Sequence, residues 1–378
     1  MKFTVARDVL AEAVSWTARA LPVRPASPIL AGVRIHAAAE ELHLSSFDYE
    51  VSANSTIPAT VEEPGDVLVS GRLLADISKS LPSKPVTFEL DGQKVNLTCG
   101  SSRFMLAVMP IDEYPLLPAQ PETAGAIDSQ VLAQAVTQVS IAASKDDTLP
   151  LLTGVRIEID GGRMTLLATD RYRLAMRELE WEPADPSIEQ IALVKARILQ
   201  DVAKSMTSGA KVELGVSTEN QPGASSLIGF TAAGRRTTST LMDGDYPPVR
   251  RLFPDSTPIQ AVCDRHALLE AVKRMALVAE RKTSVRLSFT EGRLVLEAGQ
   301  GENAQALEAI EATLFGEEIA TAFNPQFLLD GLAVMDTDYV RFGFTHPNKP
   351  AVMTGQTKAD EGEISTFRYL LMPIRFGV

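Results

Sequence analysis

Cysteine is scarce in this sequence, and no part of it is a long apolar run. Only Cys99 and Cys263 occur in 378 residues, too few for the disulfide framework of a small secreted protein. No apolar stretch approaches the roughly 20 residues of a membrane-spanning helix, and residues 1–8 lack the apolar core of a secretory signal. These absences predict a cytoplasmic protein with reduced thiols and no membrane partner.

Signatures of catalysis are also missing. The sequence has no P-loop, no dinucleotide-binding glycine pattern, no nucleophile elbow and no zinc-protease helix. Its four histidines, His36, His43, His266 and His346, show no ligand spacing, and no pattern singles out a carboxylate pair. We therefore expect no catalytic residue, no metal and no cofactor. An enzyme or small-molecule binder stays open as the alternative, and it would need titratable groups that converge in a pocket.

An excess of positive charge is absent too, since the net charge is −12. Proteins that attract nucleic acid usually carry a basic footprint. A protein that encloses its ligand needs only local cations, and an acidic exterior then limits unspecific binding. The charge alone does not decide between these cases.

What the sequence does contain is an internal repeat. The segment VLAEAV at 9–14 returns as VLAQAV at 131–136 and, more loosely, as ALLEAV at 267–272. GVRI at 32–35 returns at 154–157 and as SVRL at 284–287. The period is far longer than the roughly 20–50 residues of a solenoid repeat, and it matches a whole domain. The chain therefore uses one fold three times in tandem, with predicted domains at 1–123, 124–256 and 257–378.

Each copy reads helix, strands, helix, strands. The first helices begin near residues 8, 128 and 264, and alternating strands follow at 33–37, 155–159 and 285–289. The copies also end alike, in VMP at 108–110, LMD at 241–243 and LMP at 371–373. This order predicts an α+β fold in which each copy has two helices and antiparallel sheets.

The second helix of the first two copies combines an apolar face with a charged one. Leu73, Leu74, Ile77 and Leu81 are expected to face the core, while Arg72 and Lys79 share another face. The second copy repeats the cations as Arg197 and Lys204. An ordinary solvated helix face is the plain alternative, but repeated cations also suit sequence-independent contact with phosphates.

Three segments break the repeat. The second copy has TDRYR at 169–173 where the first has FDYEV at 47–51, and the shared aspartate is expected in an Asx-type turn. YPPVRRLF at 246–253 and the apolar end YLLMPIRF at 369–376 are the other two. Apolar side chains rimmed by arginine and tyrosine suit a groove for a short hydrophobic peptide. Packing at a domain junction is the alternative.

Taken in order along the chain, several short motifs resemble one known family. They are MKFTV at 1–5, RP at 24–25 before PIL at 28–30, ATD at 168–170 with RLA at 173–175, YP at 246–247 before RR at 250–251, and MPIR at 372–375. The chain is similar over its full length to the bacterial DNA polymerase III beta subunits, the replicative sliding clamps. It departs from many of them at Arg171-Tyr172, where they have Gly-His, and by the extra Gly377-Val378.

The resemblance implies a non-catalytic subunit that acts in DNA replication as a ring-shaped homodimer of six like domains around duplex DNA. The subunit interface would carry onto Phe104 and Leu106 in the first copy and onto Leu277 and Val278 in the third. As cations that face DNA we predict Arg24, Arg72, Lys79, Arg197 and Lys204.

The resemblance also implies a partner-peptide groove between the second and third copies. Its members in this sequence would be Leu152, Thr169, Arg171, Tyr172, Arg173, Leu174, Pro247, Arg251, Leu252, Leu370, Met372, Pro373, Ile374 and Arg375. The implied partners are double-stranded DNA bound without sequence preference, the polymerase catalytic subunit, the clamp loader, and repair polymerases and other proteins with a clamp-binding motif. A peptide-binding scaffold that never touches DNA is a further alternative.

Overall fold

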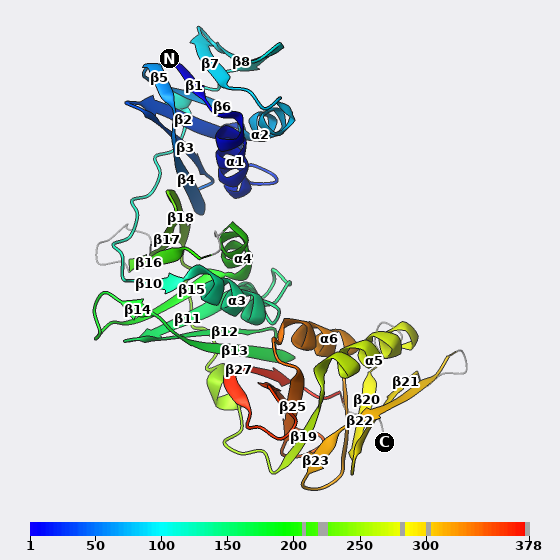
Figure 1. Cartoon of the computed structure of the whole chain (residues 1–378). Helices are drawn as coiled ribbons and strands as arrows, with labels where there is room; N and C mark the ends of the chain where they lie inside the picture. Colours follow the sequence, from blue (N-terminus) through cyan, green and yellow to red (C-terminus); the bar gives the residue numbers. More distant parts are fainter. Residues whose placement is uncertain (206–208, 218–225, 280–283, 300–303, 375–378) are drawn as a thin grey trace. The chain divides into compact units, whose positions relative to one another are not determined.

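The computed structural model describes residues 1–205, 209–217, 226–279, 284–299 and 304–374. The chain folds into two compact units (Figure 1). One unit comprises Met1–Gln130, Trp181–Pro186 and Asp201–Leu241, and the other comprises Val131–Glu180, Ser187–Gln200 and Met242–Val378. The middle copy of the repeat therefore contributes residues to both units.

The first unit holds two antiparallel sheets within its described residues. The smaller has the order β5-β1-β7-β8-β9, from β1 (Lys2–Val5), β5 (Thr60–Glu63), β7 (Val86–Asp91), β8 (Lys94–Cys99) and β9 (Ser102–Ala107). The larger has the order β14-β10-β16-β17-β18-β4-β3-β2-β6. Its strands are β2 (Gly32–Ala38), β3 (Glu41–Phe47), β4 (Val51–Pro58), β6 (Gly65–Ser70), β10 (Gly125–Asp128), β14 (Glu182–Pro183), β16 (Lys211–Ser217), β17 (Leu227–Ala232) and β18 (Arg235–Thr240).

The second unit repeats this plan. One antiparallel sheet has the order β15-β11-β12-β13-β27-β26-β25-β19-β23. It is built from β11 (Gly154–Asp160), β12 (Arg163–Thr169), β13 (Arg173–Glu180), β15 (Glu189–Lys195), β19 (Ile259–Asp264), β23 (Thr313–Phe315), β25 (Tyr339–Phe344), β26 (Ala351–Gln356) and β27 (Ile364–Leu371). The other has the order β22-β21-β20-β24, from β20 (Val285–Thr290), β21 (Arg293–Ala298), β22 (Ala306–Glu311) and β24 (Ile319–Phe323).

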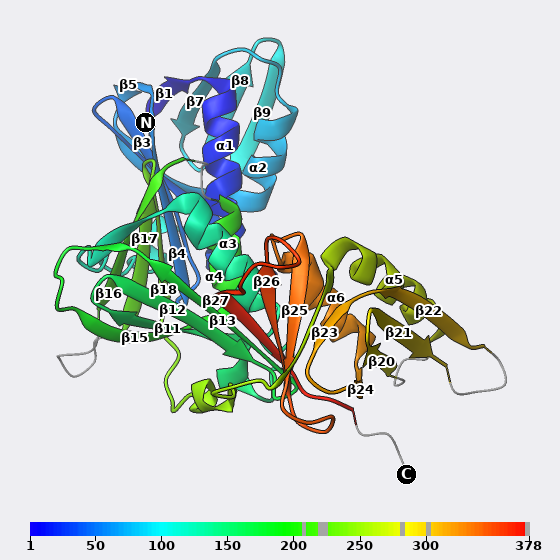
Figure 2. The ribbon, with the colours of Figure 1, turned by 60° about the horizontal axis from the view of Figure 1, so that its bottom comes forward.

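Both nine-stranded sheets run across a boundary between copies. In the first unit β4 of copy one pairs with β18 of copy two, and we call this pairing the first junction. In the second unit β13 of copy two pairs with β27 of copy three (Figure 2), and we call this the second junction. Neighbouring copies are thus joined by backbone hydrogen bonds as well as by side-chain packing.

Helices cover the sheets in each copy. They are α1 (Arg7–Thr17), α2 (Gly71–Ser80), α3 (Ser129–Ser140), α4 (Ala196–Ser205), α5 (Arg265–Val278) and α6 (Pro325–Val334). Short 3-10 turns lie at η1 (Ala18–Ala20), η2 (Pro28–Ala31), η3 (Ile111–Glu113), η4 (Pro150–Thr153) and η5 (Val249–Leu252). The expected two helices per copy and the α+β class are confirmed.

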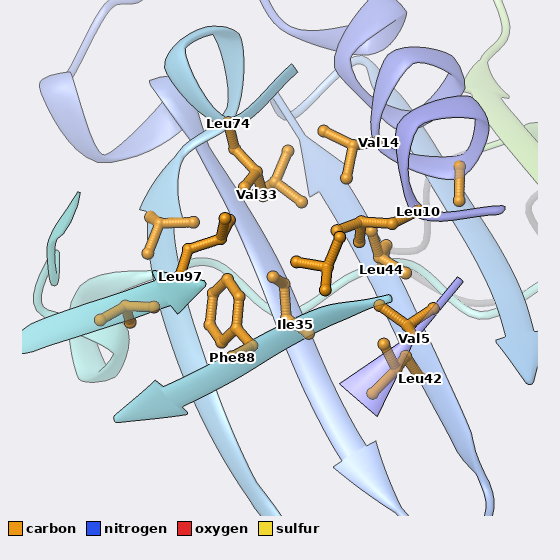
Figure 3. Packing of buried hydrophobic residues seen from close by; sticks show 14 of the residues in the cluster. Val5, Leu10, Val14, Val33, Ile35, Leu42, Leu44, Leu74, Phe88 and Leu97 are labelled. Atoms are coloured by element: carbon orange, nitrogen blue, oxygen red, sulfur yellow. The ribbon is translucent and has the colours of Figure 1, made fainter. Parts of the chain in front are cut away.

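The core of the first copy explains why its two helices are amphipathic. Leu10 and Val14 of α1 and Leu74 of α2 point onto Val33 and Phe88 of the sheets (Figure 3), and all five are fully buried. Burying such aliphatic and aromatic side chains contributes roughly 1.5–3 kcal/mol each. The α5 helix begins as its sequence predicts, because the Asp264 carboxylate accepts a hydrogen bond from the Ala267 N–H at 2.7 Å.

Two sequence expectations fail in detail. Leu73 is half exposed, whereas Leu74 and Ile77 are buried, because the buried stripe of α2 passes through Leu74 and leaves Leu73 at its edge.

The similar short segments that end the three copies are not structurally equivalent in the third copy. Met109 N–H donates to the Leu68 carbonyl and Met242 N–H to the Leu193 carbonyl, but in the third copy Ile374 N–H makes this bond, to the Ala322 carbonyl. The equivalent of Met242 is therefore Ile374, because Leu370 pairs with β13 at the place where Thr238 pairs with β4, and Ile374 follows Leu370 at the same distance in sequence as Met242 follows Thr238.

Candidate functional site

The turn between β12 and β13 carries residues that break the repeat. The Asp170 carboxylate accepts hydrogen bonds from the N–H groups of Tyr172 and Arg173, each at 3.0 Å, which is the Asx-type turn predicted for this aspartate. Arg171 lies at the tip with a φ of 80°, a left-handed conformation that few side chains adopt. The Thr169 hydroxyl donates to the Arg173 carbonyl at 2.6 Å. The turn is therefore fixed from both of its strands.

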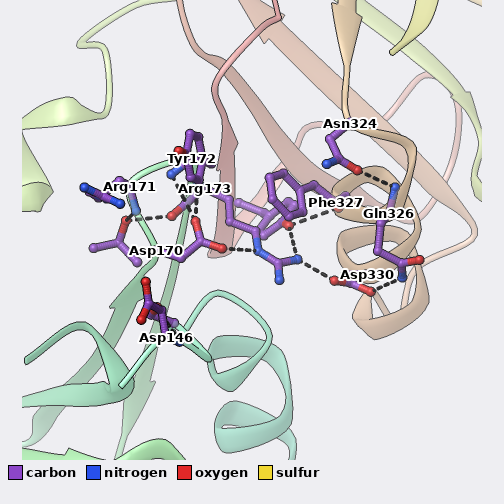
Figure 4. A network of polar contacts seen from close by, with 12 residues as sticks. Asp146, Asp170, Arg171, Tyr172, Arg173, Asn324, Gln326, Phe327 and Asp330 are labelled. Atoms are coloured by element: carbon purple, nitrogen blue, oxygen red, sulfur yellow. Dashed lines mark hydrogen bonds and ion pairs between the residues drawn. The ribbon is translucent and has the colours of Figure 1, made fainter. Parts of the chain in front are cut away.

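Arg173 is buried beneath this turn and fastens it to α6 (Figure 4). Its guanidinium donates to Asp170 at 3.0 Å, to Asp330 at 2.5 Å and to the Tyr369 hydroxyl at 3.2 Å, and it lies 4.3 Å from the centre of the Phe327 ring. Burial alone would lower the pKa of Arg173, but Tyr369, Asp330 and Asp170 together raise it above its usual value. With 6% of its surface exposed, Arg173 is buried beneath the turn, and its place in the predicted groove stays a prediction.

Four neighbouring strands place one residue each in a single row across the second junction. Thr169 pairs with Leu174, Leu174 with Leu370, and Leu370 with Val352. Directly paired residues of an antiparallel sheet point to the same face, so the row forms one surface. All four residues are buried, and Leu174, Leu370 and Val352 are aliphatic, so these three make most of the row an apolar floor.

A hydrophobic cluster covers this floor. Leu152, Tyr246 and Val249 pack with the row, and the Tyr246 hydroxyl accepts a hydrogen bond from the Thr169 N–H at 3.0 Å. Burial raises the pKa of Tyr246. Sequence reasoning missed Val249 and Val352. Val249 lies inside a segment that it singled out, but Val352 belongs to a strand buried on both faces, which gives no alternation to read.

Several predicted groove residues form an exposed edge around the cluster. Tyr172, Leu252, Met372 and Ile374 are large apolar side chains that stay exposed, with 57% of the Tyr172 surface accessible. Met372 is held beside the turn because its N–H donates to the Tyr172 carbonyl at 2.9 Å. Large apolar side chains that are exposed close together are typical of a binding surface, and this hydrogen bond brings Tyr172 and Met372 together.

The other predicted groove residues differ in their surroundings. Pro247 is exposed and Pro373 partly buried, while Arg171 and Arg251 are exposed cations. Neither guanidinium makes an ion pair with any residue that the structure describes. Arg375 lies outside the described residues. The second junction therefore brings together an apolar floor, an apolar rim and two uncommitted positive charges.

The predicted DNA-facing cations all lie at the surface. Arg72 and Lys79 are exposed on α2, Arg197 and Lys204 on α4, and Arg24 in the loop before η2. Arg72 donates to the Pro22 carbonyl at 3.0 Å. Within the described part of the chain, none of the five forms an ion pair, so each charge remains available to a phosphate.

The predicted subunit-interface residues lie on or near the two small sheets. Phe104 is exposed on the edge strand β9, and Leu277 is 86% exposed near the end of α5, where Val278 is partly buried. Leu106 is only 2% exposed and belongs to the core of the first copy. Leu106 points to the same face of β9 as Phe104, and Met105 is exposed on the opposite face, so the place of Leu106 at the interface stays a prediction.

In the residues that the structure describes, no group of three histidine, cysteine or acidic side chains could hold a metal ion. No described helix is both long and apolar enough to cross a membrane.

Three family models match consecutive parts of the chain. The N-terminal domain of the DNA polymerase III beta subunit matches residues 1–118, its central domain matches 126–248, and its C-terminal domain matches 250–375. A beta sliding clamp of Streptomyces coelicolor is 52% identical over 375 residues and covers 99% of both chains. One of Micrococcus luteus is 56% identical over 314 residues, which is 83% of this chain and 100% of the relative.

Solved structures agree with these relatives. The DNA polymerase sliding clamp of Bacillus subtilis superposes with a TM-score of 0.91 at 28% identity, and a Pseudomonas aeruginosa sliding clamp bound to griselimycin with 0.90 at 27%. Both matches cover 100% of each chain. The chain therefore belongs to the DNA polymerase III beta subunit family, the beta sliding clamps, which act as processivity factors in DNA replication and have no catalytic activity of their own.

Proposed function

We propose that two copies of this chain close head to tail into a ring around duplex DNA. The proposal rests on one observation. Both junctions are formed by the same pair of strands of the repeat. β18 and β27 are each the last strand of a five-stranded array, and β4 and β13 each begin a four-stranded array after the same type of turn. By the same correspondence, β9 ends a five-stranded array and β22 begins a four-stranded array, and in the described chain each of them is an edge of its sheet.

The free edges of β9 and β22 suit each other as a third junction. β9 is the edge of a five-stranded sheet and β22 the edge of a four-stranded sheet, so their pairing would make a third sheet of nine strands. On the outward face, exposed Met105 of β9 would meet exposed Leu307 of β22. On the opposite face, Phe104 would lie toward Leu277 and Val278 of α5, which packs against β22. A head-to-tail contact of this kind closes into a ring when its rotation closes, and it removes two edges that would otherwise promote aggregation.

We further propose that Arg24, Arg72, Lys79, Arg197 and Lys204 face the DNA. Their charges are exposed and uncommitted, although the chain as a whole is acidic. Contacts to phosphates fix no sequence and weaken as salt rises, so a closed ring could slide while the topological link prevents its loss.

The exposed apolar surface at the second junction is proposed as the groove for short linear motifs. Its occupants would be the polymerase catalytic subunit and, in turn, the clamp loader and repair factors. Apolar side chains of a peptide would rest on Tyr172, Leu252, Met372 and Ile374 above the buried row. We also propose the domain limits 1–123, 124–256 and 257–378, and a cytoplasmic location.

Retention on DNA tests the function. After loading, the protein should remain on nicked circular DNA during gel filtration and should be lost when the circle is cut once. Equal retention on circular and linear DNA would contradict topological binding. A scaffold that binds only peptides would be retained on neither form.

A further inference from the structure

The four residues of η5 have three different surroundings. Val249 is buried in the hydrophobic cluster over the apolar floor, whereas Arg251 and Leu252 are exposed and Leu252 belongs to the apolar rim. Arg250 lies against two glutamates of the sheet. A single 3-10 turn has weak hydrogen-bond geometry of its own, so the contacts of Val249 and Arg250 decide where η5 lies.

Two carboxylates of the sheet are placed to receive Arg250. Glu158 of β11 and Glu178 of β13 are each directly paired with Thr165 of β12, so they point to one face. It is the face of the apolar floor, since Leu174 precedes Glu178 by four residues on β13. The Arg250 guanidinium donates to Glu158 at 2.7 Å and to Glu178 at 3.4 Å. Arg250 therefore ties η5 to two strands at once.

Two further arginines of the same face accompany the glutamates. Arg156 donates to Glu158 at 2.7 Å, and the guanidinium of Arg368 lies 3.9 Å from the Glu178 carboxylate. Burial alone would raise the pKa of Glu158, but hydrogen bonds from Arg156 and Arg250 lower it. Glu158 is therefore ionised at neutral pH, and Arg250 meets a negative charge there.

The first junction has no such contact. His36 and Thr56 take the places of the two glutamates in the register of its strands. Pro118 takes the place of Arg250, because it follows the buried tyrosine of its own copy by the same four residues, and its side chain has no hydrogen-bond donor. Of the two junctions, the contact therefore belongs to the one at which Leu252 forms part of the rim.

We propose that Arg250 is a positioning residue of the groove, which holds η5 on the sheet and thereby keeps Leu252 in place at the rim. The proposal rests on the groove assigned above. Without the contact of Arg250, only Val249 would fasten η5, and the turn could lift from the charged end of the face. A ligand would then lose part of its binding free energy to ordering the turn.

Limited digestion with trypsin measures the contact without any ligand. A protease cuts a segment while it is locally opened, so the rate of cutting after Arg251 reports how often η5 leaves the sheet. Glu158→Gln removes the closer charge and leaves the cleavage sequence unchanged, and it should speed this cut about fivefold. Glu178→Gln should have a smaller effect. Arg156→Gln is the matched control, because it removes another partner of Glu158 that does not contact η5, and it should leave the rate unchanged.

Binding of the polymerase catalytic subunit, the occupant proposed above, measures the positioning itself. Surface plasmon resonance on the full-length protein should show release about threefold faster from Glu158→Gln than from the wild type, and no change in Arg156→Gln. Arg250→Lys keeps the charge but not the planar fork of the guanidinium. It should recover part of the affinity that Arg250→Ala loses.

The outcomes separate this role from the groove. An unchanged rate of cutting in Glu158→Gln would overturn the contact as the tie of η5. Faster cutting with unchanged release of the subunit would overturn the positioning role and leave the groove standing. If the wild type did not bind the subunit, the groove would fail and the positioning role with it, whatever the rates of cutting.

Discussion

The two junctions between copies share a backbone design and differ in what they present to a ligand. In the first junction the Asp48 carboxylate accepts from the N–H groups of Glu50 and Val51 at 3.0 and 2.7 Å, as Asp170 does in the second. The Thr240 N–H donates to the Glu50 carbonyl at 2.9 Å, the counterpart of the bond from Met372 to Tyr172. The two junctions therefore share the same hydrogen bonds around their turns.

In each junction a buried tyrosine hydroxyl accepts a hydrogen bond from the backbone of the strand before the turn. The Phe47 N–H donates to the Tyr114 hydroxyl at 2.7 Å, and the Thr169 N–H donates to the Tyr246 hydroxyl at 3.0 Å. Burial raises the pKa of Tyr114 to about 12. Both tyrosines therefore remain protonated at neutral pH and serve as structural acceptors.

The rows of residues across the two junctions differ. In the first junction the row is Phe47, Ser52, Thr238 and Gly229, and the hydroxyls of Ser52 and Thr238 hydrogen-bond each other. Gly229 leaves room for the Gln120 side chain, which would lie 2.2 Å from a Cβ at that position. The first junction thus has a polar floor that the chain itself covers.

The second junction has Leu174, Leu370 and Val352 at the matching places. The comparison indicates that a ligand surface arises from a change of side chains on an unchanged joint. Function is argued from these side chains because the fold is the same at both sites.

The largest expected difference between the junctions concerns Arg173. Arg173→Ala would leave Asp170 and Asp330 without their cation and should lower the free energy of unfolding by about 3–5 kcal/mol. The matched change in the first junction, Val51→Ala, removes no charge and should cost about 1 kcal/mol or less. Urea denaturation of both variants measures this. Similar losses in the free energy of unfolding of the two variants would show that Arg173 does not stabilise the second junction.

A smaller loss of stability is expected when one residue in the row of the second junction is replaced by its counterpart from the first junction. Leu370→Thr introduces the residue type of the first junction, loses apolar packing and buries a hydroxyl, so it should cost about 2–3 kcal/mol and weaken peptide binding. Thr238→Ala removes only the hydrogen bond to Ser52, at a cost of about 1 kcal/mol, and should leave peptide binding intact. Loss of peptide binding in Thr238→Ala would break the comparison.

The smallest effect should be equal in the two junctions. Tyr114→Phe and Tyr246→Phe each remove the acceptor of a buried N–H and should cost about 1–2 kcal/mol. Thermal unfolding of the two variants side by side checks this equivalence. A shift in one variant alone would mean that the joints are not braced alike.

Much of this architecture could be predicted from the sequence because the repeat compares the chain with itself. The shared Asp48 and Asp170 predicted the turns, and the unshared Arg171 and Tyr172 marked the second junction. Spacing could not show that Arg173 turns inward, since its partner Asp330 lies 157 residues away.

Other details could not be predicted from the sequence, for physical reasons. Leu106 was assigned to an interface by family position, which could not show that this side chain is already buried in the core of the first copy. The correspondence of Met372 with Met242 failed because the register of β27 on β13 makes Leu370 the equivalent of Thr238, and the similar short endings are out of step with that register. Such errors concern register and side-chain direction, which are fixed by tertiary packing.

The central claim is that a third junction, between β9 and β22, forms between two copies of the chain. Light scattering at micromolar concentration measures it most directly. The wild type should have a mass near twice 40.8 kDa, and Leu307→Glu on β22 should reduce it toward a single chain. Ile191→Glu, on the edge strand β15, which has no proposed partner, should leave the dimer intact. A wild-type mass of 40.8 kDa, or a dimer insensitive to Leu307→Glu, would contradict the account.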